Sequence, residues 1–305
     1  MEETNHPDLI SIREARDLTE RAHLAALKLR RLSQKKIDNI CEAMARAGFK
    51  AADSLARMAV EETGFGVVED KAAKNRLATA NLWAYIQNMK TVGFLDEEAP
   101  VRRIAEPMGV VAGIIPSTNP TSTALYKIII SLKARNSIVL SPHPAALNCI
   151  LKSADILLEA ARSAGAPRYS ILCMTVPHLA GTGELMSHPR IGVILATGGT
   201  ALVKAAYSSG KPAFGVGPGN VPAFIERTAD PAKAVADITL SKCFDNGTVC
   251  ASEQSIIVDQ PLDEEVRRLL TETGSHFCSP EEIRMLEHLM LVPVRGINPR
   301  IVGQS

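Results

Sequence analysis

The chain has 305 residues, 46% of them hydrophobic and 22% charged, which is typical of a soluble globular protein of roughly two domains. A net charge of +1 and an aromatic content of 4% argue against a surface that binds nucleic acid. No apolar run is long enough to span a membrane and the N-terminus lacks a signal-peptide pattern, so we expect a cytoplasmic protein whose separated cysteines are free thiols and which binds neither membrane nor metal.

The first hundred residues are predicted to be helical. Apolar residues at helical spacing indicate helices over about 33–48 and 55–64, each ended by a glycine, and a third over about 71–89. In the third helix we expect Leu77 and Trp83 to face inward. These helices are expected to pack on a core, and no chemistry is predicted before residue 100.

From Gly109 onward, short apolar strands alternate with helices. Strands are predicted at 110–115, 137–140, 171–174 and 191–195, and helices at 121–132, 146–164 and 201–207. Continuously apolar strands separated by helices are typical of a parallel sheet that is covered on both faces. Such a Rossmann-like α/β sheet binds its ligand beyond the carboxyl ends of the strands.

A second α/β unit is predicted to begin near Pro222, with strands at 223–225 and 255–258 and helices at 231–242 and 263–271. We therefore expect residues 1–221 to hold the N-terminal helices and a dinucleotide-binding domain, and residues 222–305 to hold part of a catalytic domain. A unit of about eighty residues with so few strands closes a core poorly, so we expect further residues of this domain to lie outside the chain.

Two glycine-containing turns are candidate ligand sites. Thr197–Thr200 lies between a strand and a helix, where backbone N–H groups and the helix dipole favour a phosphate, although a simple tight turn accounts for it equally well. Gly215–Asn220 carries three glycines that let a backbone approach a ligand closely, or that simply link two domains. A domain junction is a common ligand site, so these two interpretations are compatible.

Two polar segments carry candidate catalytic residues. Asn119 follows the first parallel strand, where its amide either donates to an oxyanion or caps the next helix. Cys250 lies among small residues after a glycine turn, in a loop that could present a thiol. Its spacing alone still favours a buried, inert cysteine.

Six segments in order resemble the aldehyde dehydrogenase superfamily, and more closely its CoA-acylating branch, which includes the aldehyde dehydrogenase half of bifunctional aldehyde–alcohol dehydrogenases. They are IPSTNPTST (115–123), SPHPA (141–145), LATGGT (195–200), KAAYSSGKP (204–212), GVGPGN (215–220) and FDNGTVCASEQ (244–254). The combination is highly specific and extends over residues ~100–260. The resemblance implies an aldehyde dehydrogenase-like fold, and relatives that continue past the position of Ser305.

The resemblance also implies roles for individual residues. Cys250 matches the catalytic cysteine and Asn119 matches the asparagine that, with the Cys250 backbone N–H, holds the oxyanion. The residues expected to contact the cofactor are Pro116, Ser117, Thr118, Ser141, His143, Pro144, Thr197, Gly198, Gly199, Thr200, Gly215, Gly217 and Gly219.

Two departures from the hydrolytic branch favour the acylating one. Gly215 stands where hydrolytic enzymes carry their glutamate general base, and Ser141–Pro144 replaces a lysine and a nearby glutamate that bind the adenosine ribose. The resemblance thus implies NAD(P)-dependent oxidation of a small aldehyde to an acyl-CoA, and the reverse reduction, through a cysteine thioester in a homo-oligomer. Two alternatives stay open: a hydrolytic aldehyde dehydrogenase, and a nucleotide- or CoA-binding pseudoenzyme or assembly subunit.

Overall fold

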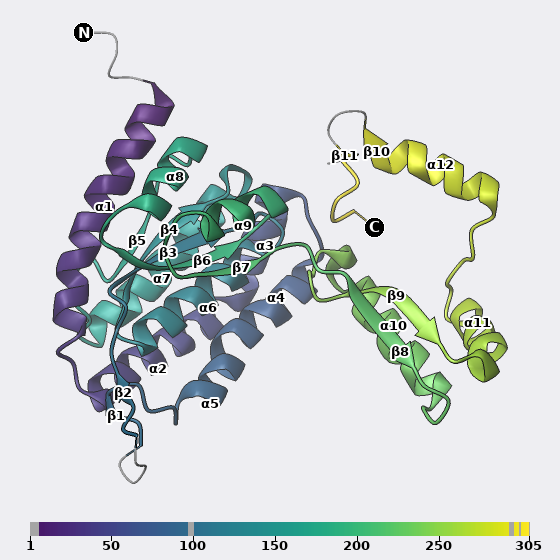
Figure 1. Ribbon diagram of the computed structural model, residues 1–305, viewed down its shortest axis with the longest axis horizontal. Helices are drawn as coiled ribbons and strands as arrows, with labels where there is room; N and C mark the ends of the chain where they lie inside the picture. Colours follow the sequence, from purple (N-terminus) through teal and green to yellow (C-terminus); the bar gives the residue numbers. More distant parts are fainter. Residues whose placement is uncertain (1–5, 97–100, 293–295, 299, 305) are drawn as a thin grey trace. The chain divides into compact units, whose positions relative to one another are not determined.

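The chain divides into two units in the computed structural model, which describes residues 6–96, 101–292, 296–298 and 300–304 (Figure 1). The first unit contains the described residues up to Thr63 and Val68–Gly217, and the second contains Gly64–Val67 and the described residues from Pro218 onward. The sequence-based boundary after residue 221 lies a few residues inside the second unit. The division of cofactor binding and catalysis between the two units stays a prediction.

A five-stranded parallel sheet is the centre of the first unit. Its order is β5-β4-β3-β6-β7, so β3, the first of these five strands in the sequence, is the middle strand. The strands are β3 (Val110–Ile115), β4 (Ser137–Pro142), β5 (Ile171–Cys173), β6 (Ile191–Thr197) and β7 (Ala213–Val216). The first four match the predicted strands, and β3 and β4 are buried along their whole length, as two-sided strands should be. The fifth, β7, was not predicted as a strand.

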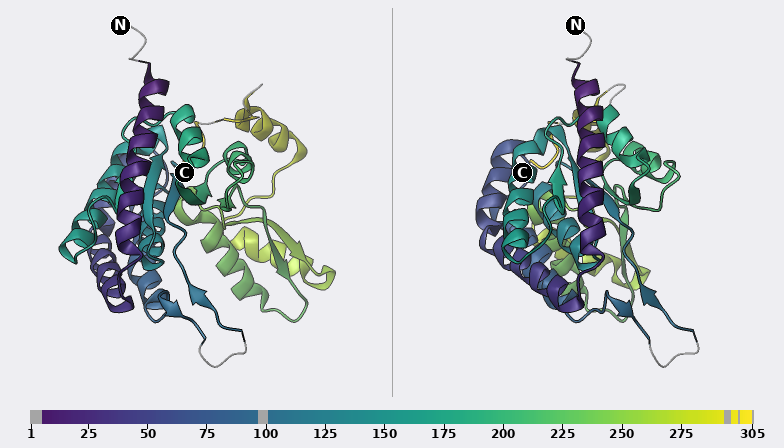
Figure 2. Two further views of the ribbon diagram at one scale, coloured as in Figure 1. Left: turned by 60° about the vertical axis from the view of Figure 1, so that its left-hand side comes forward. Right: turned by 90° about the vertical axis from the view of Figure 1, so that its left-hand side faces the viewer.

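Helices cover both faces of this sheet (Figure 2). Val110, Ala112 and Ile114 of β3 share one apolar core with α1 (Pro7–Leu29), α8 (Leu179–Ser187) and α9 (Thr200–Tyr207). Val111 and Ile115 alternate to the opposite face, where they pack with α2, α3, α6 and α7. The bounds of these four helices are Gln34–Lys50, Ala52–Thr63, Pro120–Lys133 and Leu147–Ser163. The predicted parallel sheet with helices on both faces is therefore confirmed.

The third predicted helix is a continuous run made of α4 (Val68–Arg76), a π-helical turn η1 (Leu77–Asn81) and α5 (Leu82–Ile86). Trp83 packs partly buried against the core, as expected, but the inward placement of Leu77 is wrong because this side chain is 62% exposed. The buried stripe runs instead through Lys71, Asn75 and Thr79, whose polar groups have hydrogen-bond partners inside the unit. An apolar pattern therefore misidentified the inner face of this helix.

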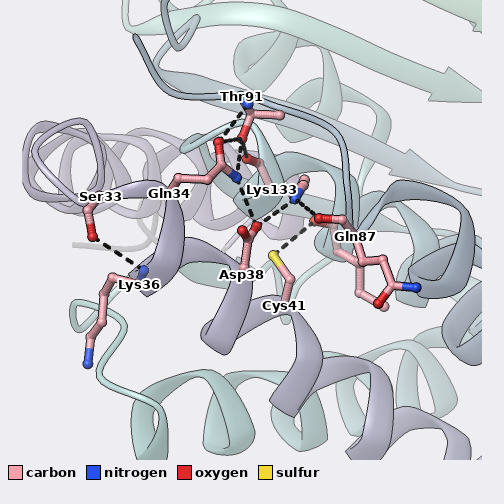
Figure 3. Close-up of polar contacts among 9 residues, drawn as sticks. Ser33, Gln34, Lys36, Asp38, Cys41, Gln87, Thr91 and Lys133 are labelled. Atoms are coloured by element: carbon pink, nitrogen blue, oxygen red, sulfur yellow. Dashed lines mark hydrogen bonds and ion pairs between the residues drawn. The ribbon is translucent and has the colours of Figure 1, made fainter.

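A polar network around the buried Lys133 joins α2, α6 and the segment after α5 (Figure 3). Lys133 Nζ on α6 donates to Asp38 Oδ1 on α2 at 2.5 Å and to the carbonyl of Gln87, just after α5, at 3.0 Å. The Gln34 amide adds a bond to Asp38 Oδ1 at 2.9 Å and accepts from the Thr91 N–H at 2.8 Å. Because the buried ammonium has a carboxylate and a carbonyl as partners, the network fixes the chain that leaves α5 without stranding a charge.

The second unit is built around a parallel pair of strands, β8 (Val221–Ile225) and β9 (Glu253–Val258). Its small buried core consists of Ile225 on β8, Val235 on α10 (Pro231–Cys243) and Val266 on α11 (Asp263–Glu272). These elements match the predicted strands and helices of this unit.

Several short elements complete the described structure. They are the β1–β2 hairpin (Gly93–Phe94, Ile104–Ala105), η2 (Pro144–Ala146), η3 (Phe244–Gly247), η4 (Gln260–Leu262), α12 (Pro280–Met290), β10 (Leu291–Val292) and β11 (Gly296–Ile297). Helix α12 begins with a capping box between Ser279 and Glu282. No helix within the described residues is both long and apolar enough to cross a membrane.

Candidate active site

The strand order places a topological switch point at the carboxyl edge of the sheet. From β3 the chain moves outward through β4 to β5, and then returns to place β6 on the other side of β3. At such a switch point the two loops leaving the adjacent strands turn in opposite directions, and ligands of open α/β sheets bind between them. Here the two loops are the segment 116–119 after β3 and the turn 198–199 after β6.

The turn after β6 has the features of an anion site. Gly199 is the N-cap of α9, and a Cβ added to it would meet nothing within 4 Å, so the approach to the helix N-terminus is open. Thr200 at the first helical position is exposed. The hydroxyl of Thr197 is buried and has no hydrogen-bond partner among the described residues, which is unfavourable unless a ligand or solvent completes it. Gly198 donates its N–H to the carbonyl of Val216 at 3.1 Å, which ties this turn to β7.

The segment after β3 presents Asn119 in a fixed orientation. Pro116 is buried, whereas Ser117, Thr118 and Asn119 are partly exposed. Asn119 occupies the N-cap position of α6 but its side chain makes no capping bond, so the capping interpretation of this side chain is wrong. Instead, Oδ1 accepts from Lys74 Nζ at 2.6 Å and Nδ2 donates to Thr118 Oγ1 at 3.2 Å. Because a lysine can only donate, the amide nitrogen must point away from Lys74.

Helix α4 holds this segment from below, which the sequence reading missed. Lys71 Nζ donates to the carbonyl of Thr118 at 3.0 Å, and Asn75 links the hydroxyl of Thr121 to the carbonyl of Ala52. Together with Lys74, these residues lie at helical spacings of three and four in EDKAAKN, so they share one face of the helix. This row of polar residues on one helix face was the feature of the sequence that could have predicted their contact with the segment after β3.

Lys127 of α6 lies directly beneath the switch point. Its Nζ donates to the carbonyl of Ile114 in β3 and to that of Leu195 in β6, each at 2.8 Å. The side chain is 1% exposed, and burial lowers the pKa of Lys127 to about 7. A neutral amine has two N–H groups, which are enough to serve both carbonyls. Lys127 therefore joins the two strands from which the candidate ligand loops depart.

The predicted cofactor residues at the end of β4 differ in their exposure. Ser141 is buried, and its hydroxyl is bonded to that of Thr182 on α8 at 2.8 Å, so the side chain faces the protein interior. His143 and Pro144 are exposed at the same edge as the other loops. Desolvation lowers the pKa of His143, whose Nδ1 accepts from the Ala145 N–H at 3.2 Å. His143 is therefore an outward-facing imidazole whose desolvation favours the neutral form.

Gly215 and Gly219 are required by close packing. Gly215 lies within β7, where an added Cβ would come within 2.6 Å of Val203 Cγ1 and 2.8 Å of the Tyr207 ring, both on α9. Gly219, in the second unit, lies against the loop that contains Cys250, because a Cβ added to it would be 2.1 Å from the carbonyl oxygen of Cys250. Gly217 has only a loose contact at 3.8 Å. Gly219 therefore brings two backbones together and Gly215 lets β7 pack on side chains of α9, while the ligand contact expected of this motif stays a prediction.

Cys250 is exposed at the tip of a turn, so the interpretation as a buried, inert cysteine is wrong. The turn closes where Ser252, which is buried, donates its N–H to the carbonyl of Val249 at 3.1 Å. Cys41 and Cys149, in contrast, are buried in the first unit, and burial raises the pKa of the Cys41 thiol to about 12. An exposed thiol can meet a substrate, whereas these buried thiols cannot.

A small cavity adjoins the loop that contains Cys250 within the second unit. Its volume is about 230 Å³, and residues on both sides of Cys250 contribute to its wall. The lining residues are Asp237, Leu240, Ser241, Phe244, Val249 and Ala251. The wall is therefore mainly apolar with two polar groups from α10.

The chain resembles known proteins along most of its length. The sequence model of the aldehyde dehydrogenase family matches residues 5–278. The bifunctional aldehyde-alcohol dehydrogenase of Escherichia coli (strain K12) is 44% identical over 296 residues, which are 96% of this chain and 33% of that protein. The chain thus spans about a third of that relative.

Two solved structures illustrate the structural likeness. An acetylating aldehyde dehydrogenase from Geobacillus thermoglucosidasius has a TM-score of 0.93 and 51% identity, covering 99% of this chain and 67% of the other. A propionaldehyde dehydrogenase from Rhodopseudomonas palustris, solved with bound CoA and an acylated cysteine, has a TM-score of 0.83 and 31% identity, covering 95% of this chain and 67% of the other.

Proposed function

Because the chain belongs to the aldehyde dehydrogenase family, we propose that it oxidises a small aldehyde to an acyl-CoA with NAD(P), and catalyses the reverse reduction, through a thioester on Cys250. The family predicted from the motifs is confirmed, and similar proteins include enzymes named as acetylating. The exposed thiol of Cys250, beside an apolar cavity, is the observation that carries the proposal. We also propose that the protein acts in the cytoplasm as a homo-oligomer.

The carboxyl edge of the sheet fits a dinucleotide. The switch point between β3 and β6, the open N-terminus of α9 and the unpaired Thr197 hydroxyl suit a pyrophosphate and its neighbouring sugar. We assign Gly198, Gly199 and Thr200 to the phosphates, while the exposed His143 and Pro144 are candidates for the adenosine end. When bound, NAD(P)+ supplies the acceptor for the hydride that leaves the aldehyde carbon.

In the proposed reaction the Cys250 thiolate attacks the aldehyde carbonyl and gives a thiohemiacetal oxyanion. The Nδ2 group of Asn119 and the backbone N–H of Cys250 stabilise this charge as it forms. Lys74 contributes indirectly, because its bond to Oδ1 keeps the amide nitrogen of Asn119 available as the donor end. Loss of hydride from the carbon leaves an acyl thioester on Cys250.

The second half of the reaction needs an acyl acceptor. Gly215 has no side chain that could activate water, and a Cβ added there would overlap Val203 and Tyr207. Coenzyme A is itself a thiol nucleophile, so it can take the acyl group by thioester exchange without a general base. Because one thioester replaces another, the same groups support the reverse reduction of an acyl-CoA.

Product stoichiometry tests the proposal. The chain is incubated with a short aliphatic aldehyde and NAD(P)+, with and without coenzyme A, and Cys250→Ala serves as the inactive control. We expect acyl-CoA and NAD(P)H in equal amounts, with little free acid. NAD(P)H formation at full rate without coenzyme A, with a carboxylic acid product, would establish the hydrolytic alternative. Nucleotide binding without turnover under any condition would favour the pseudoenzyme.

A further inference from the structure

The loop that leads to Cys250 contains three consecutive residues in the left-handed region. Asp245 has φ 51° and ψ 40°, Asn246 has φ 52° and ψ 38°, and Gly247 has φ 69°. Residues with a side chain rarely adopt this conformation, and they keep it only where the surroundings hold them. The loop must therefore be anchored by contacts outside itself.

Asp245 provides such an anchor. Its side chain is fully buried, and its Oδ1 accepts the backbone N–H of Val67 at 2.8 Å, while Oδ2 accepts the hydroxyl of Thr248. Gly66 lies so close that an added Cβ would be 2.0 Å from Oδ1. The residues 64–67 belong to the second unit with the nucleophile loop, although about 180 positions separate them in the sequence.

A third segment joins the same contact. The carbonyl of Gly303 accepts the Gly66 N–H at 2.9 Å and the Asn246 Nδ2 at 3.1 Å. On the other side of Asp245, its backbone carbonyl accepts the N–H of Thr248 at 3.1 Å and lies 2.9 Å from the Thr248 hydroxyl, whose single proton it shares with Oδ2. The turn from Asp245 to Thr248, two residues before Cys250, is thereby fastened at both of its ends.

We propose that Asp245 is a positioning residue, whose buried carboxylate holds the left-handed turn onto the backbone of residues 66–67 and so sets the direction of the Cys250 thiol. The proposal rests on the assignment of Cys250 as the nucleophile. In this role Asp245 acts only through the hydrogen bonds that orient the loop, and it does not contact the reacting atoms. A thiol displaced by about 1 Å from its attack geometry loses roughly 10²-fold in rate.

Four variants separate this role from a general loss of structure. Asp245→Ala removes the anchor. Asp245→Asn keeps an oxygen for the Val67 N–H, and its Nδ2 can donate to the Thr248 hydroxyl, which then donates to the Asp245 carbonyl. Gly66→Ala pushes a methyl group into the anchor from the other side. Asp230→Ala removes the N-cap of α10 in the same unit, and is the matched control for lost stability.

Two measurements report separately on the hydrogen bond between Asp245 and Val67 and on its effect on Cys250. Hydrogen exchange of the Val67 amide reports the bond to Asp245 and needs no activity. The kcat and KM for aldehyde oxidation, compared with the rate at which iodoacetamide alkylates Cys250, report the direction of the thiol.

We expect Asp245→Ala to expose the Val67 amide and to lower kcat by roughly 10–100-fold, with the KM and the alkylation of the still exposed thiol changed only a few-fold. Gly66→Ala should behave alike, whereas Asp245→Asn and Asp230→Ala should stay within a few-fold of the parent chain. Equal losses in Asp245→Ala and Asp245→Asn, or an unchanged kcat in Asp245→Ala, would overturn the proposal. If Asp245→Ala does not fold, Asp245→Asn against Gly66→Ala gives the same comparison.

The two hypotheses fail in different ways. A parent chain that makes no acyl-CoA rejects the proposed function, yet the Val67 exchange series still decides whether Asp245 anchors the loop. A parent chain that makes acyl-CoA while Asp245→Ala is fully active rejects only the positioning role.

Discussion

Lys127 predicts a measurable dependence of stability on pH. The buried amine joins the carbonyls of Ile114 and Leu195, and burial lowers its pKa from 10.5 to about 7. Lys127→Met keeps a side chain of similar length but removes both donors and the titrating group. The variant should therefore lose the two hydrogen bonds of the Lys127 amine at every pH, and lose the pH dependence that the amine contributes.

The sign and size follow from proton linkage. Between pH 7 and 10.5 the unfolded chain keeps the Lys127 proton while the folded chain has released it, so the free energy of unfolding rises with pH. One pH unit corresponds to about 1.4 kcal/mol. Because the folded group is only half titrated near pH 7, the gain from pH 7 to pH 9 is about 2 kcal/mol. Loss of the two hydrogen bonds adds roughly 1–3 kcal/mol that does not depend on pH.

Urea unfolding followed by tryptophan fluorescence can measure this. Trp83 is the chain's single tryptophan and packs against the core of the first unit, the unit that contains Lys127. The stability difference between the parent and Lys127→Met should widen by about 2 kcal/mol from pH 7 to pH 9. Contributions of groups such as His143 and Cys41 are common to both proteins and cancel. Lys133→Met, which removes the ion pair with Asp38, controls for removing a buried lysine from the same helix. A difference that stays flat between the two pH values would refute the buried neutral amine.

The remaining predictions concern the candidate site. Cys250→Ala should abolish aldehyde oxidation but leave the nucleotide dissociation constant unchanged, and the exposed Cys243 should not substitute; near-normal turnover in this variant would exclude Cys250 as the nucleophile. Asn119→Ala should lower kcat by roughly 10²–10³-fold with little change in the nucleotide dissociation constant. An unchanged kcat together with a large loss of nucleotide affinity would instead show that Asn119 binds the cofactor. Gly215→Ala should destabilise the first unit by roughly 1–3 kcal/mol, because its Cβ would overlap Val203, and an unchanged unfolding midpoint would contradict that packing.

Local patterns identified the elements and many of the site residues. The strands β3, β4 and β6 were predicted because a short, continuously apolar run between turn residues indicates a buried strand. Their parallel arrangement then put Asn119 and the turn at Thr197 at one edge, since carboxyl ends of parallel strands share an edge. The GVGPGN and FDNGTVC segments were recognisable from residue identity alone.

What the sequence by itself determined is therefore the order of elements, the parallel sheet and the family to which the chain belongs. Tertiary structure alone decided which face of α4 is buried, that Lys74 rather than a helix cap holds the Asn119 amide, and that Asp245 is bonded to the backbone of Val67. The physical reason is the same in each case. A polar side chain becomes buried when a partner from a distant segment satisfies it, and neither hydrophobic periodicity nor spacing along the chain carries information about that partner.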